Sequence, residues 1–264
     1  MIDYSKVNKK WWNEVTSIHA KSALYNLNNF KKGKTSLESI EKEELGVVKG
    51  KSLLHLMCHF GMDTLSWARE GAIATGVDLS DHSIMLAQQL SREIKVPADF
   101  ICSDIYNLPQ VLDKKFDIVF TSYGVLCWVK DIKKWARLIS HFLKDGGTFY
   151  IVELHPFCNI LSHDLKLYYK YFDKGPYIDD STGTYADWDA DVKGLTYEWS
   201  YTMGDVINSL IGVGLTIEYV HEFPFSTYDQ FPGFMEINKK GQYVLKNKKI
   251  QLPLLFSLKA IKPA

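Results

Sequence analysis

The chain has 264 residues, enough for one large α/β domain or for a core domain that carries a substantial insertion. Acidic and basic side chains balance at 31 each, so no overall field attracts nucleic acid or an anionic membrane, and a small partner molecule is favoured. Residues 1–12 lack the apolar stretch of a signal peptide, and no later run approaches the length of a membrane span. We therefore expect a cytoplasmic monomer or homodimer without nucleic-acid or membrane partners.

The cysteines are scattered near predicted strand ends, which favours reduced thiols over a disulfide framework: Cys58, Cys102, Cys127 and Cys158. Two His-x-x-Cys pairs, formed by His55 and His155 with the cysteines three residues later, supply the ligand set of a tetrahedral zinc site. Such sites usually lie on compact knuckles rather than at strand ends. We therefore expect small buried thiols and no metal.

Strands and helices alternate through the middle of the chain, without a repeat or linker that divides it. Buried strands are predicted at 52–57, 73–77, 98–102, 116–121 and 148–152. Helices are predicted at 63–70, 84–94 and 132–143. Ser80 and Asp81 supply the N-cap of the second helix, and Asp145-Gly146-Gly147 ends the third. This alternation predicts a doubly wound parallel sheet that binds ligands at the carboxyl ends of its strands.

The carboxyl-terminal part changes the pattern. A helix at 205–211 precedes strands at 215–221 and 252–260, which lack a crossover helix between them and should pair antiparallel. The predicted fold class is therefore α/β, a doubly wound, mostly parallel seven-stranded sheet with an antiparallel carboxyl-terminal strand. Lysines in the intervening loop favour a solvated surface over nucleic-acid contact: Lys239, Lys240, Lys246, Lys248 and Lys249.

Two segments lie outside the core pattern, and we expect both near the carboxyl edge of the sheet within a single domain of residues 1–264. Residues 1–48 form a helical cap whose later helix begins with a Thr35-x-x-Glu38 capping box. Residues 156–202 form an aromatic-rich lid insertion. Its rings would suit a flat hydrophobic acceptor, although a lid that packs only on itself explains them equally well.

The first predicted strand runs into a tight turn that opens a helix. There Gly61 can take a positive φ, Asp63 can cap the helix, and backbone N–H groups can hold an anionic group. Asp78 ends the second strand at the spacing expected of a ribose-binding carboxylate. Asp104 follows the third strand, where it can accept a hydrogen bond from an exocyclic amine such as that of adenine.

In this order, the glycine-bearing turn, GVDLS, SDIYNLP, FDIVFTSYG and LKDGG resemble the class I S-adenosylmethionine (SAM)-dependent methyltransferases. The resemblance implies an enzyme that transfers the methyl group of SAM to a small, hydrophobic or aromatic metabolite. It implies that the turn lines the methionine part, Asp78 holds the ribose, and further residues flank the adenine and the sulfonium. The implied cofactor residues are Met57, Cys58, His59, Gly61, Asp78, Leu79, Asp104, Ile105, Ser122 and Tyr123. The sequence departs from the family at His55, Met57 and His59, where an acidic residue and two glycines are usual.

Methyl transfer from a sulfonium needs alignment and exclusion of water more than acid–base chemistry. Tyr123 and Trp128 could face the sulfonium or could simply pack. Glu153 and His155 emerge at the carboxyl end of the fifth strand and are the candidate catalytic bases, His155 having a structural role as its alternative. His19 could also reach the pocket, although a core role suits it better.

Two rival functions remain open at this point. One is a regulatory protein that binds SAM without turnover, which the altered first turn suggests. The other is a nicotinamide-dependent oxidoreductase, because such enzymes also have a turn after the first strand, a helix that follows it and a carboxylate at the end of the second strand. The absent G-x-G-x-x-G motif counts against this function.

Overall fold

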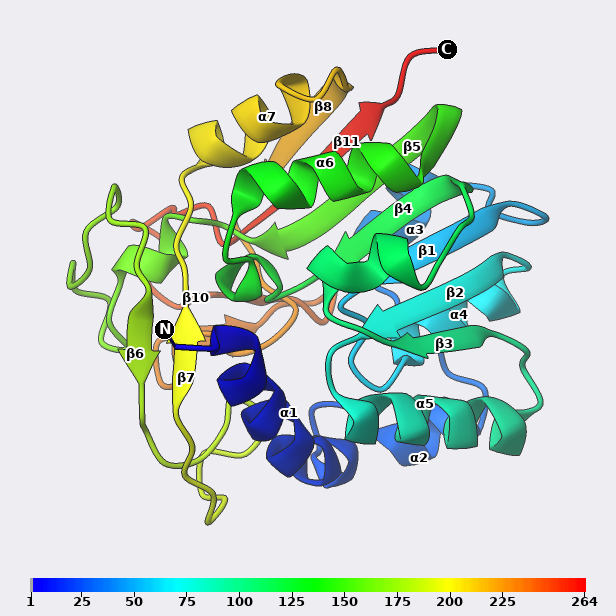
Figure 1. The fold of residues 1–264 in the computed structure, drawn as a ribbon. Helices are drawn as coiled ribbons and strands as arrows, with labels where there is room; N and C mark the ends of the chain where they lie inside the picture. The colour runs from blue at the N-terminus through cyan, green and yellow to red at the C-terminus, as the bar shows by residue number, and fades with distance from the viewer. Residues whose placement is uncertain (1) are drawn as a thin grey trace.

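A seven-stranded sheet forms the centre of the computed structural model, which describes residues 2–264 and so leaves out only Met1 of the predicted cap (Figure 1). The strand order is β3-β2-β1-β4-β5-β11-β8. The strands are β1 (Ser52–Leu56), β2 (Ile73–Asp78), β3 (Asp99–Cys102), β4 (Phe116–Ser122), β5 (Leu143–Leu154), β8 (Thr216–Phe223) and β11 (Leu255–Ile261). Strands β1 to β5 pair in parallel, whereas β11 is antiparallel to both β5 and β8, which confirms the predicted sheet.

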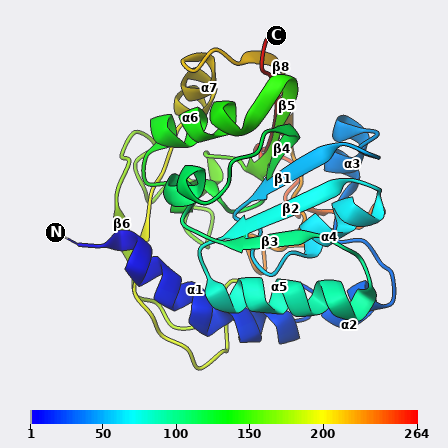
Figure 2. The same cartoon turned by 45° about the vertical axis from the view of Figure 1, so that its right-hand side comes forward.

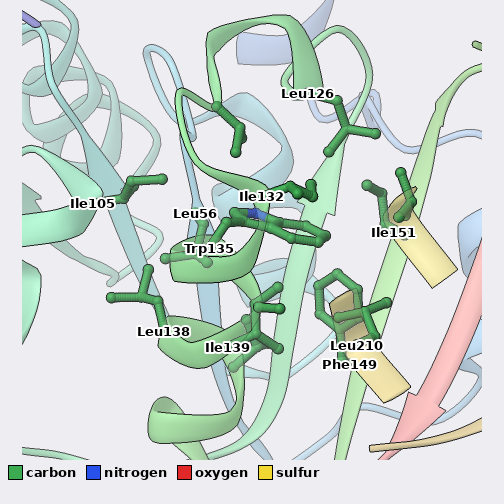
Figure 3. Packing of buried hydrophobic residues seen from close by; sticks show 14 of the residues in the cluster. Leu56, Ile105, Leu126, Ile132, Trp135, Leu138, Ile139, Phe149, Ile151 and Leu210 are labelled. Atoms are coloured by element: carbon green, nitrogen blue, oxygen red, sulfur yellow. The ribbon is translucent and has the colours of Figure 1, made fainter. Parts of the chain in front are cut away.

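One face of the sheet is covered by α6 (Ile132–Phe142) and α7 (Met203–Ile211). Helix α6 places Trp135, Leu138 and Ile139 on one side, three and four residues apart, and buries them against β1 and β5 (Figure 3). The indole of Trp135 is fully buried and meets the Phe149 ring edge-on at 5.4 Å. The packing of this apolar side of α6 fixes the positions of β4 and β5. It therefore also fixes the position of the loop that follows β4.

The opposite face is covered by α3 (Ser39–Leu45) and α4 (Met62–Arg69), while α5 (Asp81–Ile94) packs beside β2 and β3. The predicted Thr35-x-x-Glu38 capping box is wrong by three residues, because α3 is capped by Glu38 with Glu41 at the third helical position. Glu41 is fully buried, where its carboxylate accepts from the Glu38 N–H at 2.7 Å and from the Tyr123 hydroxyl at 3.0 Å. Burial, with the nearby Asp63 charge, raises the pKa of Glu41 to about 8.

We predict that Glu41→Gln flattens the pH dependence of stability. Folding raises the pKa of Glu41 from 4.5 to about 8, so the folded state binds the extra proton and loses stability as the pH rises through this window. Glutamine keeps the neutral form, so the free energy of unfolding should fall less between about pH 5 and pH 8 than in the wild type. Unfolding by denaturant at both pH values measures this free energy. The control is Glu43→Gln, which changes an exposed glutamate of the same helix. Parallel profiles for Glu41→Gln and wild type would contradict the assignment.

Two sequence expectations need correction in the second half. Helix α6 ends at Phe142 rather than at Asp145-Gly146-Gly147, because β5 begins at Leu143 and runs through these residues beside β4. The loop before β11 contains a hairpin, β9 (Met235–Ile237) and β10 (Tyr243–Leu245). The lysines around this hairpin are exposed, and Lys248 pairs with Glu236 at 2.6 Å, in agreement with a solvated surface.

The two outer segments meet each other over the carboxyl edge of the sheet. Helix α1 (Tyr4–Lys21) lies alongside α5, where Lys9 pairs with Asp81 at 2.9 Å (Figure 2). Asn8 of α1 exchanges two hydrogen bonds with the backbone of Tyr197 in β7 (Thr196–Glu198), which pairs with β6 (Tyr177–Asp179). The short helix α2 (Leu27–Lys31) follows α1. Across residues 2–264, none of the helices combines the length and apolarity that crossing a bilayer requires.

Candidate functional site

A cavity of about 660 Å³ opens at the carboxyl ends of β1, β2, β3 and β4. The loops after these strands form its floor, and residues of both outer segments, such as Trp12 and Tyr185, form its opposite wall. All ten residues predicted to contact a cofactor line this one cavity: Met57, Cys58, His59, Gly61, Asp78, Leu79, Asp104, Ile105, Ser122 and Tyr123. The parallel topology brings them together, because each follows the carboxyl end of a neighbouring strand.

The turn after β1 keeps a left-handed backbone at three alternate positions. Met57 has φ 58°, His59 φ 51° and Gly61 φ 77°. Such values are uncommon for residues with a Cβ and are normally taken by glycine. Met57 and His59 therefore follow the backbone path of a glycine-rich turn although neither is glycine. At Gly61 no side chain fits, since a Cβ would lie 2.5 Å from the Phe100 ring.

Two expectations about this turn are corrected. The N-cap of α4 is Gly61 rather than Asp63, which lies one residue inside the helix. The predicted cradle of free amides is also reduced, because three of the N–H groups bond within the protein. Those of Cys58 and Gly61 donate to the carbonyls of Val77 and Cys58, and that of His59 donates to the Asp78 carboxylate. The turn therefore has few free N–H groups for an anion, and a ligand would contact mainly its side chains and its backbone surface.

Asp78 and Asp104 stand at the ends of β2 and β3 with their carboxylates fixed by the backbone. Asp78 accepts from the N–H groups of His59 at 2.8 Å and Ser80 at 2.9 Å, and burial raises its pKa to about 6. Asp104 accepts from the Tyr106 N–H at 2.9 Å and from the Ser5 hydroxyl of α1 at 2.5 Å. Both carboxylates are thus oriented at the cavity wall, with lone pairs left for a ligand.

Asp63, which the sequence predicts only as a helix cap, contributes a carboxylate to the cavity. It accepts hydrogen bonds from the hydroxyls of Ser36 at 2.6 Å and Ser122 at 2.9 Å, and burial raises its pKa. His55 lies behind Ser122, its Nε2 3.4 Å from the Ser122 Oγ, and burial lowers the pKa of this histidine to about 3. Asp63 therefore brings a carboxyl group to this end of the cavity, where position 55 has none.

The charged side chains of the cavity wall are mostly acidic. Two lysines, Lys34 and Lys130, stand against five carboxylates: Glu38, Asp63, Asp78, Asp104 and Glu198. Among residues 2–264, no side-chain nitrogen of a lysine, arginine or histidine lies within 4.0 Å of the carboxylate oxygens of Asp63, Asp78, Asp104 or Glu198. Such a cavity attracts a cationic ligand and repels an anionic one.

Aromatic side chains form the rest of the wall. Tyr123 and Trp128, the residues proposed to face a sulfonium, both line the cavity, and Trp128 meets Trp12 edge-on at 5.1 Å. His19 is buried beneath this wall, with Nδ1 3.0 Å from His59 Nε2 and Nε2 3.1 Å from the Thr184 hydroxyl. Its place is that of a core histidine joining the cap, the turn and the insertion.

Glu153 and His155, the predicted bases, lie outside the cavity. Four N–H groups, those of residues 124–126 and 154, donate to the carboxylate of Glu153, so it holds the loop after β4 in place. His155 bonds Glu222 through Nε2 at 2.8 Å and accepts the Phe157 N–H through Nδ1 at 3.1 Å. Both polar groups are fully engaged, and we assign these residues structural roles instead.

The four residues weighed as zinc ligands are separated. His55 bonds the Thr64 hydroxyl at 2.9 Å, while Cys58 lies in the turn after β1. Cys158 donates to the Pro253 carbonyl at 3.3 Å, beyond the end of β5. Within the described chain, residues 2–264, no group of three or more His, Cys, Asp or Glu side chains is arranged to hold a metal ion.

Sequence reasoning missed several residues of the opposite wall, among them Ser5, Tyr25, Tyr185 and Glu198. Tyr25 and Tyr185 join the two outer segments through their hydroxyls at 2.5 Å. Tyr25, Tyr185 and Glu198 belong to segments of irregular or short structure, where no periodicity indicates which side chains face inward, whereas Ser5 lies in the first turn of α1. For the two tyrosines, the only sequence signal is the concentration of aromatic residues in these segments.

Comparison with known proteins agrees with this geometry. Residues 54–151 match the family model described as a methyltransferase domain. The chain is 29% identical over 152 residues to a ubiquinone biosynthesis O-methyltransferase of Chromobacterium violaceum, an alignment that covers 58% of this chain and 61% of that protein. The chain thus spans about three-fifths of the length of this curated relative.

Solved structures share the fold at lower identity. A SAM-dependent methyltransferase from Mesorhizobium loti superposes with a TM-score of 0.60 at 21% identity, covering 88% of this chain and 99% of that one. The glycopeptide N-methyltransferase MtfA, solved with SAM, gives a TM-score of 0.56 at 16% identity, covering 86% and 87%. Residues 54–151 thus match a methyltransferase domain model, and the strand order with the antiparallel β11 gives the whole chain the Rossmann-like fold that these solved methyltransferases share.

Proposed function

We propose that this protein binds SAM in the 660 Å³ cavity and transfers its methyl group to a small molecule. The observation that carries the proposal is the gathering of all ten implied cofactor residues around one cavity whose charges are mostly acidic. SAM has a sulfonium, an ammonium and one carboxylate, and therefore a net positive charge that this wall complements.

In the proposed pose the adenosine lies across the ends of β2 and β3. Asp78 accepts from the two ribose hydroxyls and Asp104 from the adenine amino group, with Leu79 and Ile105 on the faces of the ring. The methionine part follows the turn that ends at Gly61, and its ammonium faces Asp63. Loaded with SAM, the site would supply an activated methyl group. The protein would align the acceptor with this methyl group. Helix α1 and the insertion, which cover the cavity, would exclude water.

A nicotinamide dinucleotide suits this cavity less well. Its pyrophosphate carries two negative charges and requires free amides or cations near the first turn. Here three amides of that turn are bonded within the protein, and the cavity offers two lysines against five carboxylates. The same balance of charge that favours SAM therefore disfavours the dinucleotide.

For the acceptor we propose a small, hydrophobic or aromatic metabolite. Beside the cofactor residues, the cavity is lined by the aromatic side chains of Trp12, Trp128, Tyr185, Trp199 and Tyr228. Flat rings stack on such side chains and shed water there, which favours an aromatic or apolar body. Residues 1–48 would then serve as the cap and 156–202 as the lid of a single domain.

We predict that Asp63→Asn weakens SAM binding about 10- to 100-fold, the effect of losing one charge-assisted contact of about 1.5–3 kcal/mol. Asparagine keeps an acceptor for Ser36 and Ser122 but loses the charge opposite the ammonium. Isothermal titration with SAM measures the loss, and 5′-methylthioadenosine, which lacks the amino-acid part, is the matched ligand. The variant should bind methylthioadenosine as the wild type does. Equal losses for both ligands would remove Asp63 from the ammonium site.

The proposed function is tested by titrating the wild-type protein with SAM, S-adenosylhomocysteine and NADH. We expect micromolar binding of the first two and none of NADH, followed by formation of S-adenosylhomocysteine when an acceptor is supplied. Tight SAM binding without turnover under any acceptor would favour the regulatory alternative. Failure to bind either adenosyl ligand would end the proposal.

A further inference from the structure

Glu198 is a carboxylate of the cavity that the proposed cofactor pose does not use. It is the last residue of β7, in the insertion, and lines the cavity together with Trp199. Its carboxylate accepts one hydrogen bond, from the Thr196 hydroxyl at 3.2 Å, and no basic nitrogen of residues 2–264 lies within 4.0 Å of it. Burial raises the pKa of Glu198 to about 7, so it is charged at mildly alkaline pH.

The position of Glu198 assigns it to the acceptor side of the cavity. The proposed cofactor residues all lie between Met57 and Tyr123, in the loops after β1 to β4. Glu198 instead belongs to β7, and the N–H of the next residue, Trp199, donates to the Cys127 carbonyl in the loop after β4 at 2.8 Å. Burial and then the Glu198 charge raise the pKa of the Cys127 thiol, which places the carboxylate close to this loop.

The surroundings of Glu198 select among acceptor chemistries. A partly buried charge without a counter-ion is unfavourable, and a bound cation relieves it. The aromatic rings of Tyr185, Trp199 and Tyr228 line the same cavity, and rings of this kind attract a cation placed over their faces. An acceptor that carries a carboxylate, phosphate or phenolate would meet repulsion here. One of the two lysines, Lys130, has its Nζ 4.9 Å from the centre of the Tyr4 ring, which meets the Trp199 ring edge-on at 5.5 Å, but it forms no ion pair with Glu198 within 4.0 Å.

We infer that the acceptor is an amine with an aromatic or apolar body, which binds as its ammonium ion against Glu198. The inference rests on the proposed methyl transfer and adds the substrate class. Glu198 takes one N–H proton from the ammonium, and the freed nitrogen lone pair forms the bond to the methyl carbon. The carbon–sulfur bond breaks with its electron pair going to sulfur, which leaves S-adenosylhomocysteine and the methylated ammonium product. The proton on Glu198 then passes to water.

The test compares ligands of equal size that differ in charge, bound to protein saturated with S-adenosylhomocysteine at about pH 8. The ligands are 2-phenylethylamine, 2-phenylethanol and phenylacetate. We expect the wild type to bind the amine at least about tenfold more tightly than the alcohol and to bind the acid most weakly. Glu198→Gln should bring the ratio of amine to alcohol close to one. Asp191→Asn, which removes an exposed carboxylate of the same insertion, should leave the ratio unchanged.

Methyl transfer provides the second readout. With radiolabelled SAM, Glu198→Gln should lower kcat/KM for any amine that the wild type methylates by at least about thirtyfold, with the affinity for SAM kept within twofold. A wild type that binds the amine no better than the alcohol, or not at all, overturns the inference, as does a variant with unchanged selectivity. If the wild type still binds SAM in these cases, only the inferred substrate class is refuted. If the wild type does not bind SAM, the proposed function itself is refuted.

Discussion

Replacing Asp78 with asparagine is expected to weaken SAM binding about 30- to 100-fold while the protein stays folded. The carboxylate would accept two hydrogen bonds from the ribose, and losing most of their charge-assisted strength costs about 2–3 kcal/mol. In the wild type the N–H groups of His59 and Ser80 donate to the Asp78 carboxylate at 2.8 and 2.9 Å, and asparagine keeps one acceptor oxygen for them. Isothermal titration with SAM and a thermal unfolding curve measure the two effects.

The same substitution should change the pH dependence of binding. Burial raises the pKa of Asp78 to about 6, and only the ionised form can accept from both hydroxyls. The affinity of the wild type for SAM should therefore be constant above about pH 7 and fall up to about tenfold per pH unit below pH 6. In the variant the affinity should depend less on pH, because Asp78 no longer titrates.

Asp99→Asn is the matched control, because Asp99 is an exposed residue at the opposite end of β3, away from the cavity. We expect wild-type affinity and pH dependence from it. An Asp78→Asn protein that binds SAM as tightly as Asp99→Asn would show that the ribose lies elsewhere.

Replacing Gly61 with alanine is expected to destabilise the protein by about 2–5 kcal/mol and to abolish tight SAM binding. Its φ of 77° costs a residue with a Cβ about 1–2 kcal/mol. The new Cβ would also lie 2.5 Å from Cε1 of Phe100, and relieving that overlap costs about 1–3 kcal/mol more. In a chain of this size the sum lowers the melting temperature by about 5–15 °C.

Gly50→Ala separates the two contributions. Gly50 has nearly the same φ, 78°, but nothing lies within 4 Å of the position its Cβ would take. We expect it to lose only the backbone part, about 2–6 °C in melting temperature, with SAM binding unchanged. Equal losses in the two variants would mean that the turn relaxes around Phe100 and that its shape is not fixed by close packing.

The sequence was most informative where topology alone decides position. Asp78 ends β2 and Asp104 follows the end of β3, and the ends of parallel strands meet at one edge of a sheet, so their proximity follows from the strand order. The same rule placed Ser122 and Tyr123 beside them. The departures at Met57 and His59 suggested a changed loop, yet the structure retains the left-handed backbone there.

Position at a strand end does not specify what a side chain does, as Glu153 shows. It ends β5 near the cavity, but the amides of residues 124–126 surround its carboxylate, a contact between distant segments that no local pattern encodes. Glu198 is the reverse case. Its strand has three residues and is held by contacts such as Asn8 with Tyr197, so its place in the wall depends on the assembled fold.

The α3 cap failed for a different reason. The sequence pattern indicates Thr35 because threonine is a usual N-cap residue, whereas the structure uses Glu38, three residues later. Packing of Ile40 and Leu45 against the sheet decides between them by fixing where the helix begins.

A crystal structure of the protein with S-adenosylhomocysteine tests the central claim most directly. We expect both ribose hydroxyls within hydrogen-bonding distance of the Asp78 carboxylate, the adenine amino group at Asp104, and the amino-acid part along the turn toward Asp63. Density for the ligand away from both aspartates, or a cavity closed at the turn by the side chains of Met57 and His59, would contradict it.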